Sequence, residues 1–199
     1  MGSEPIRFYL DFVSTYSYFA AMRIDAVASR HGRTVDSRIV SLPHVFKAAG
    51  TLSPLDQPHK LAHNRRDTER VALQMGLRFK RPPAPPDVQQ ARLVFHHLRA
   101  RAAADAARFA REAMAVRFGE GMELTQAVLE RVCSAAGVAA DVLETGPADP
   151  AAKASLIATT QAAVEQDGMF GAPYAWVDGE RFWGHDRIVQ QLDWWLGRG

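Results

Sequence analysis

The residues best suited to take part in chemistry lie near the N-terminus, where a strand-like segment is followed directly by a helix-like one. Residues 6–13 are rich in aromatic and β-branched side chains, as in a buried strand. Apolar residues then recur with helical spacing from Tyr18 to Val27, until Gly32 ends the pattern. Ser14 therefore lies at a strand-to-helix junction.

The position of Ser14 at this junction suggests a binding place for a negative charge. The first backbone N–H groups of a helix lack intrahelical partners, and the helix dipole adds partial positive charge there. A thiolate or carboxylate beside Ser14 would be stabilised. The alternative is that Ser14 is only an N-cap, whose hydroxyl accepts a hydrogen bond from one of these amides.

A Ser-His-Asp hydrolase has weaker support. No Gly-x-Ser-x-Gly motif surrounds Ser14, and no spacing rule brings His44, His59 or His185 to it.

The histidines also raise the question of a metal site. His59 and His63 have helical i, i+4 spacing, and His96 and His97 are adjacent. No cysteine ligands or glutamate-based motif accompany them, so a solvated helix face is the preferred interpretation and no metal is expected.

The single cysteine, Cys133, lies in an apolar helical pattern. It can form no intrachain disulfide, which agrees with a reducing compartment. Its setting favours a buried structural thiol over a nucleophile. Any chemistry that needs sulfur must therefore use a bound molecule.

Composition restricts the class of protein. The chain has 199 residues, 47% hydrophobic, with a formal net charge of +2, which allows a sizeable core in one domain or in a domain with a large insertion. No apolar run approaches the roughly 20 residues of a membrane-spanning helix, and the N-terminus is polar, so we expect a soluble, cytoplasmic protein that binds no membrane. Basic residues are dispersed among acidic ones, and the dense spots at 63–66 and 79–81 lack stacking aromatics, so nucleic-acid binding is not expected.

The other elements follow from apolar periodicity and helix breakers. A second strand is predicted over residues 34–41, with the segment after it divided into a short helix over 43–49 and a loop over 51–58. Further helices are predicted over 59–75, 88–118, 124–136, 150–166 and 186–196, with a stiff proline-rich connection at 81–86. Strands are predicted over 174–177 and 180–183, joined as a hairpin by Asp178-Gly179.

This order of elements resembles the thioredoxin fold: a βαβ half, a connecting helix and a ββα half. The predicted class is α/β, a thioredoxin-like fold with a large all-helical insertion. We expect residues 1–58 and 146–199 to form the thioredoxin-like domain and residues 59–145 to form the insertion.

Thioredoxin-like proteins carry Cys-x-x-Cys where this chain has Ser14-Thr15-Tyr16-Ser17. Both sulfurs are absent, so thiol–disulfide exchange by this chain is excluded. Pro173 matches the proline that this fold holds in the cis form beside the start of the first helix.

With a serine at that place and a helical insertion, the chain resembles the kappa-class glutathione transferases and, more specifically, the bacterial 2-hydroxychromene-2-carboxylate isomerases. The resemblance covers nearly the whole chain. It rests on five motifs that occur in this order: Asp11-Phe12-Val13-Ser14 with Tyr16-Ser17-Tyr18; Pro58-His59-Lys60; Asp67 and Arg70 with Ala72 and Gly76; Gly171-Ala172-Pro173; and Trp183-Gly184-His185-Asp186-Arg187.

The resemblance implies glutathione as the cofactor and assigns roles to several residues. Ser14 would contact the glutathione sulfur and, as the catalytic residue, stabilise its thiolate. Lys60 would approach the glycine end. The backbone of Ala172, before Pro173, would pair with the cysteinyl backbone, while His185 and Asp186 would hold the γ-glutamyl group.

Three positions depart from the family pattern. Thr15 follows Ser14 where proline is usual, Thr51 stands at a cofactor-binding loop position where asparagine is frequent, and Asp87 replaces an asparagine. Glutathione binding is expected to be retained, whereas the second substrate stays open.

The implied activity is isomerisation of 2-hydroxychromene-2-carboxylate, or of a related intermediate of aromatic catabolism, by reversible thiolate addition. The partner would be a small aromatic or conjugated acid, and the family implies a homodimer. Two alternatives stay open: a kappa-like glutathione transferase that conjugates electrophiles, and a non-catalytic thioredoxin-like module that binds glutathione or peptides.

Overall fold

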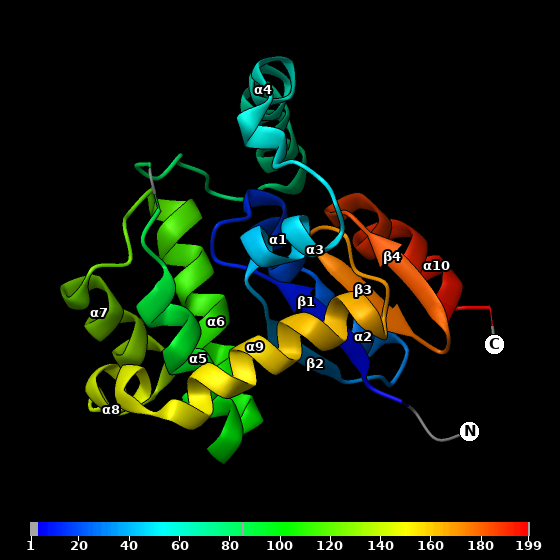
Figure 1. Ribbon diagram of the computed structural model, residues 1–199. Helices are drawn as coiled ribbons and strands as arrows, with labels where there is room; N and C mark the ends of the chain where they lie inside the picture. Colours follow the sequence, from blue (N-terminus) through cyan, green and yellow to red (C-terminus); the bar gives the residue numbers. More distant parts are fainter. Residues whose placement is uncertain (1–3, 85, 199) are drawn as a thin grey trace.

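A computed structural model describes residues 4–84 and 86–198 of the chain. Its centre is a four-stranded sheet of order β2-β1-β3-β4, formed by β1 (Ile6–Leu10), β2 (Val35–Ile39), β3 (Tyr174–Val177) and β4 (Glu180–Trp183) (Figure 1). β1 pairs in parallel with β2, whereas the β1–β3 and β3–β4 pairs are antiparallel. This is the predicted thioredoxin-like arrangement, and all four expected strands are confirmed.

Local sequence chemistry explains the β3–β4 hairpin. Asp178 and Gly179 occupy its two-residue turn with φ of 51° and 83°. Positive φ at both central residues is the geometry that matches the twist of the flanking strands, and Asp-Gly is well suited to it. The predicted hairpin is therefore confirmed.

The helices follow one another along the chain in this order: α1 (Thr15–Ala21), α2 (Ile24–Arg30), α3 (Leu42–Ala48), α4 (Pro58–Met75), α5 (Gln89–Arg101), α6 (Ala103–Met114), α7 (Gln126–Ala136), α8 (Val142–Ala148), α9 (Pro150–Glu165) and α10 (Leu192–Leu196). A short 3-10 turn, η1 (Pro54–Asp56), lies between α3 and α4. Two π-helical segments, η2 (Ala115–Glu120) and η3 (Arg187–Gln191), follow α6 and precede α10.

Each face of the sheet packs against its own set of helices. Phe8 and Leu10 lie in a large cluster with residues of α1, α2, α5, α6, α7 and α10. Tyr9, which alternates with them along β1, lies in a smaller cluster with residues of α3 and α9. Figure 1 shows α9 crossing the sheet.

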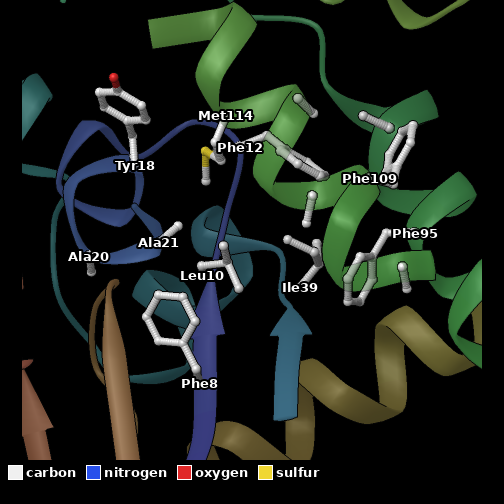
Figure 2. Close-up of a cluster of buried hydrophobic side chains, with 14 of the residues drawn as sticks. Phe8, Leu10, Phe12, Tyr18, Ala20, Ala21, Ile39, Phe95, Phe109 and Met114 are labelled. Carbon is white, nitrogen blue, oxygen red and sulfur yellow. The ribbon is translucent and has the colours of Figure 1, made fainter. Parts of the chain in front are cut away.

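The inserted helices share the core of the sheet. Phe95 of α5 and Phe109 of α6 belong to the same buried cluster as Phe8, Leu10 and Ile39 of the strands (Figure 2). In Figure 1, α4 projects away from the helices α5–α8. The division at residues 59 and 145 stays a prediction; α8 runs across the expected boundary at 146.

Three predicted helices differ in the structure. The single helix expected over 88–118 is broken at Ala102, which has extended backbone angles (φ −151°, ψ 104°). A continuous helix of that length would extend about 46 Å, beyond the core of a domain of this size. The break lets α5 and α6 pack against each other and bury Phe95 and Phe109 together.

The helix expected after Ser14 is likewise divided, at Met22 and Arg23, and the closing helix begins as the π-helical segment η3. No sequence pattern predicted α8, because it contains Gly146 and Pro147. Gly146 is needed for packing, since an ideal Cβ there would lie 3.0 Å from Val94 Cα on α5.

Candidate active site

Ser14 joins the first helix to a loop that is distant in sequence. It is the N-cap of α1, and its Oγ accepts a hydrogen bond from the backbone N–H of Ser17 at 3.1 Å. The same hydroxyl donates to the carbonyl oxygen of Ala172 at 3.3 Å. The N-cap role is therefore confirmed, and the hydroxyl proton is directed toward the loop before β3. Its bond there is long, so it can be redirected to a ligand at small cost.

The Ala172–Pro173 peptide bond is cis, as the fold resemblance implied. The carbonyl oxygen of Pro173 accepts from the N–H of Gly184 at 3.0 Å, which fixes this loop to the end of β4. The structure thus brings Ser14, Ala172 and Pro173 together from the two ends of the chain.

Tyr16 and His185 form the next part of this region. Their rings are stacked, with centroids 5.2 Å apart and an interplanar angle of 13°. Burial is the main cause that lowers the pKa of His185, although Asp186 and Asp67 act in the opposite direction. Burial therefore favours the neutral form of His185, whose ring stacks on Tyr16, two residues beyond Ser14.

Tyr16 also connects the first helix to α4. Its hydroxyl donates to Oδ2 of Asp67 at 2.6 Å. Burial, followed by this hydrogen bond, raises the pKa of Tyr16. Burial opposes ionisation of Asp67, but the hydrogen bonds from Tyr16 and Arg70 prevail and lower its pKa. The bond is therefore that of a neutral phenol to a carboxylate.

Lys60 is placed by the same helix. It is exposed on the first turn of α4 and lies seven residues before Asp67, hence on the same helical face. The rise of an α-helix separates the two by about 10 Å along the axis. Among residues 4–84 and 86–198, no hydrogen bond or ion pair joins Lys60 to Ser14.

Two other expected site residues lie at exposed places. Thr51 follows α3, and its N–H donates to the carbonyl of Phe46 at 2.9 Å. Asp186, in the segment before η3, forms an ion pair with Arg187, and its side chain is 42% exposed. Neither of them forms a hydrogen bond with Ser14 in the described part of the chain.

Beneath the Ser14 loop is a buried ion pair that sequence reasoning missed. Asp11, whose backbone carbonyl accepts the N–H of Ser14 at 3.0 Å, has a fully buried carboxylate bonded to Arg92 of α5. Asp11 belongs to the first of the five motifs on which the family resemblance rests. The sequence around Arg92, by contrast, does not distinguish Arg92 from a surface arginine. Arg117 of η2 is a second missed buried cation.

His96 and His97 correct another expectation, because they do not lie on a solvated face. Both are buried in α5. His96 bonds to the carbonyl of Ile39 and to Ser155, while His97 bonds to Asp149 and Thr145. Their role in the structure is to hold α5 against neighbouring elements.

The arrangement does not equip Ser14 as a nucleophile. An alkyl hydroxyl needs an adjacent base, and in the described residues no histidine or carboxylate forms a hydrogen bond with Ser14. What Ser14 can do is donate a hydrogen bond.

No group of three histidine, cysteine, aspartate or glutamate side chains suited to a metal ion occurs in the described ranges. No helix among them is long and apolar enough to cross a membrane.

Comparisons with known proteins agree with the fold. A family model described as a DSBA-like thioredoxin domain matches residues 5–193. A 2-hydroxychromene-2-carboxylate isomerase of Sphingobium xenophagum is 32% identical over 192 residues, which cover 94% of this chain and 95% of that protein. A protein of the same name from Pseudomonas putida is 28% identical over 190 residues, covering 92% and 90%.

Solved structures also include similar proteins. A 2-hydroxychromene-2-carboxylate isomerase structure superposes with a TM-score of 0.85 at 27% identity, covering 98% of this chain and 95% of that one. A probable DsbA oxidoreductase from Streptomyces coelicolor has a TM-score of 0.74 at 18% identity, covering 98% and 91%, and shows the shared fold alone.

Proposed function

This chain belongs to the DSBA-like thioredoxin domain family and, within it, is related over nearly its whole length to 2-hydroxychromene-2-carboxylate isomerases; from this we propose that it is a glutathione-dependent isomerase of 2-hydroxychromene-2-carboxylate or of a related intermediate of aromatic catabolism. The relatives' names support the reaction and substrate. The cofactor and the mechanism are our proposal.

The observation that carries the proposal is the bond of Ser14 to Ala172. It places a hydroxyl donor beside the backbone that precedes a cis-proline, at the position where thiol enzymes of this fold carry cysteine. A donor there, in a chain whose single cysteine is buried elsewhere, suits a sulfur supplied by a bound molecule.

The donor set fits glutathione. The exposed cation of Lys60 suits a carboxylate, and the exposed carboxylate of Asp186 suits an ammonium group. The backbone of Ala172, before Pro173, suits pairing with a peptide backbone. Thr51, exposed in the loop between α3 and η1, would supply a hydroxyl to the same ligand. A γ-glutamyl tripeptide carries both charges and a backbone between them.

When bound, glutathione would supply a thiolate nucleophile for reversible addition to the conjugated acid and would be regenerated when the isomer leaves. Ser14 would then donate its hydroxyl proton to the sulfur and hold it ionised, helped by the N–H groups that open α1. Because α1 has only seven residues, most of this stabilisation must come from the hydroxyl. Tyr16 and His185 would form an apolar wall that excludes water from the reacting atoms.

The test is the ultraviolet absorbance of the glutathione thiolate as pH is varied, in wild type and Ser14→Ala, together with isomerisation rates. A hydrogen bond to a charged group is worth roughly 1.5–3 kcal/mol, so the wild type should lower the thiol pKa by about one to two units relative to the variant. Ser134→Ala, an exposed helical serine, is the matched control and should behave as wild type.

The outcomes separate the candidate functions. Turnover without loss of glutathione supports the isomerase, whereas consumption of glutathione in step with product identifies a transferase. Binding without a lowered pKa identifies a non-catalytic module. Equal turnover by wild type and Ser14→Ala would contradict the role of Ser14.

A homodimer located in the cytoplasm belongs to the same proposal. Sedimentation equilibrium of the purified chain tests the dimer, and a mass of a single chain would contradict it.

A further inference from the structure

Arg117 is a buried cation in the segment that follows α6. It lies in η2, its residue is 2% exposed, and neither Nε nor Nη1 has a hydrogen-bond partner within residues 4–84 and 86–198. Buried polar atoms are almost always hydrogen-bonded, and arginine does not lose its proton in proteins. An arginine in this state therefore requires an explanation.

The nearby carboxylates do not provide one. Asp11 influences Arg117 electrostatically, but its two oxygens already accept bonds from Arg92 and from the N–H of Leu42. Glu123, the other acidic neighbour, is exposed, and no ion pair with Arg117 is formed in the described residues. Burial opposes the charge and lowers the pKa of Arg117.

The position of η2 brings Arg117 to the Ser14 region. Phe118, the next residue, stacks on Tyr18 with ring centroids 5.9 Å apart. Tyr18 is one turn beyond Ser14, whose carbonyl accepts the N–H of Tyr18 at 3.2 Å. Asp11, which influences Arg117, lies three residues before Ser14. The guanidinium carbon lies 5.5 Å from the centroid of the Phe118 ring, and this ring is the one that stacks on Tyr18. The guanidinium therefore lies near residues that precede and follow Ser14 in the chain.

The preceding helix supports this placement. Phe109 of α6 packs edge-on against Phe12 at 6.4 Å between centroids, and Figure 2 shows Met114, the last residue of α6, beside Phe12. η2 therefore starts at the β1–α1 connection. Its π-helical geometry is uncommon and is frequent at functional sites.

We propose that Arg117 binds the carboxylate of an aromatic acid substrate and makes the site selective for carboxylates over neutral molecules with the same ring. The planar guanidinium offers two parallel N–H donors that match the two oxygens of a carboxylate. This inference rests on the proposed function, because it takes the aromatic acid as the ligand.

The test compares chromone-2-carboxylate with chromone-2-carboxamide, which share a ring and differ in charge, by isothermal titration with and without glutathione. Wild type should bind the carboxylate roughly tenfold to a hundredfold more tightly, the range for hydrogen bonds to a charged group. Arg117→Met should remove this preference. The control is Arg111→Met, in α6 directly before η2, which removes an equal charge from an exposed ion pair with Asp25. This variant should retain the preference for the carboxylate.

Thermal stability of the Arg117 variants distinguishes a role in ligand binding from a role in folding. Replacing an uncompensated buried charge by an apolar side chain should leave the thermal midpoint unchanged or raise it. If Arg117→Met does not fold, Arg117→Lys takes its place, since it keeps the charge without the planar fork and should lose most of the preference.

Equal binding of the two probes by wild type, or a preference retained in the Arg117 variants, would overturn the inference. Isomerase turnover with an unchanged KM in Arg117→Met would overturn it as well, while leaving the proposed function intact. A carboxylate preference that depends on Arg117, in a chain without isomerase turnover, would support Arg117 and contradict the proposed function.

Discussion

The guanidinium of Arg92 forms two hydrogen bonds with the carboxylate of Asp11: Nε donates to Oδ1 at 3.0 Å, and Nη2 donates to Oδ2 at 2.6 Å. The pair joins α5 to the end of β1, three residues before Ser14. Oδ2 also accepts the N–H of Leu42 at 2.8 Å, which fixes the start of α3. One buried carboxylate therefore orders three elements around the candidate site.

Arg92→Met should destabilise the protein by about 3–5 kcal/mol, because it leaves Asp11 charged and buried with only one backbone donor. Urea unfolding at pH 7 measures this. The control is Arg131→Met, which breaks an exposed pair with Glu120 and should cost at most about 1 kcal/mol. A loss from Arg92→Met as small as that of the control would contradict the structural role of the pair.

Acid should weaken the fold through His96. Its Nε2 faces the carbonyl of Ile39, which can only accept, so Nε2 carries the proton and Nδ1 accepts from Ser155. Burial lowers the pKa of His96 to about 4, from 6.5 in the unfolded chain. Between these two pKa values the unfolded state therefore binds more protons than the folded state. The contribution of His96 to the free energy of unfolding is complete above pH 6.5, and it falls by about 3 kcal/mol as the pH drops to 4.

Urea midpoints at pH 7 and pH 5 check the contribution of His96. His96→Gln should be less stable than wild type at pH 7 but should lose less stability on acidification. His59→Gln, at an exposed position, should follow the wild-type profile. A His96→Gln profile as steep as that of wild type would show that other groups cause the acid sensitivity.

Cys133 should be unreactive in the folded protein. It is fully buried, and burial, with smaller effects of Asp141 and Glu130, raises the pKa of its thiol to about 11. The thiolate, which is the reactive form, is therefore both scarce and inaccessible at pH 8. An aromatic disulfide reagent should detect no thiol in native buffer and one thiol per chain in urea; one thiol titrated within minutes in native buffer would refute this.

Tyr16→Phe should loosen α4 from the rest of the molecule, because it removes the hydroxyl bonded to Asp67. We expect a loss of about 1–2 kcal/mol and faster amide hydrogen exchange in α4 than in wild type, with α9 unchanged. Glutathione affinity should fall in parallel if α4 positions Lys60.

Tyr18→Phe is the matched control for Tyr16→Phe. It removes the hydroxyl that donates to the carbonyl of Arg78, beyond the C-terminal end of α4, so it should leave exchange near Lys60 unchanged. Equal exchange in the two variants at the start of α4 would show that the Tyr16–Asp67 bond does not hold that end of the helix.

The elements that local patterns specify could be predicted from the sequence. The apolar patterns of the strands, the Asp178-Gly179 turn and the capping serine at position 14 are features of residues close in the chain. The order of these elements restricted the topology to a thioredoxin-like fold, and the absence of cysteine near Ser14 excluded thiol exchange. The resemblance then identified the residues to examine as a site.

The tertiary structure decided which distant groups meet. Ser14 and Ala172 are 158 residues apart, and Asp11 and Arg92 are 81 apart, so no local periodicity contains their pairing. The break at Ala102 and the packing of Gly146 on Val94 have the same origin, because both satisfy close packing between helices instead of backbone preference. Arg117 is the extreme case: its charge predicts a surface residue, and only the folded core shows a cation buried beside the candidate site without a bonded partner among the described residues.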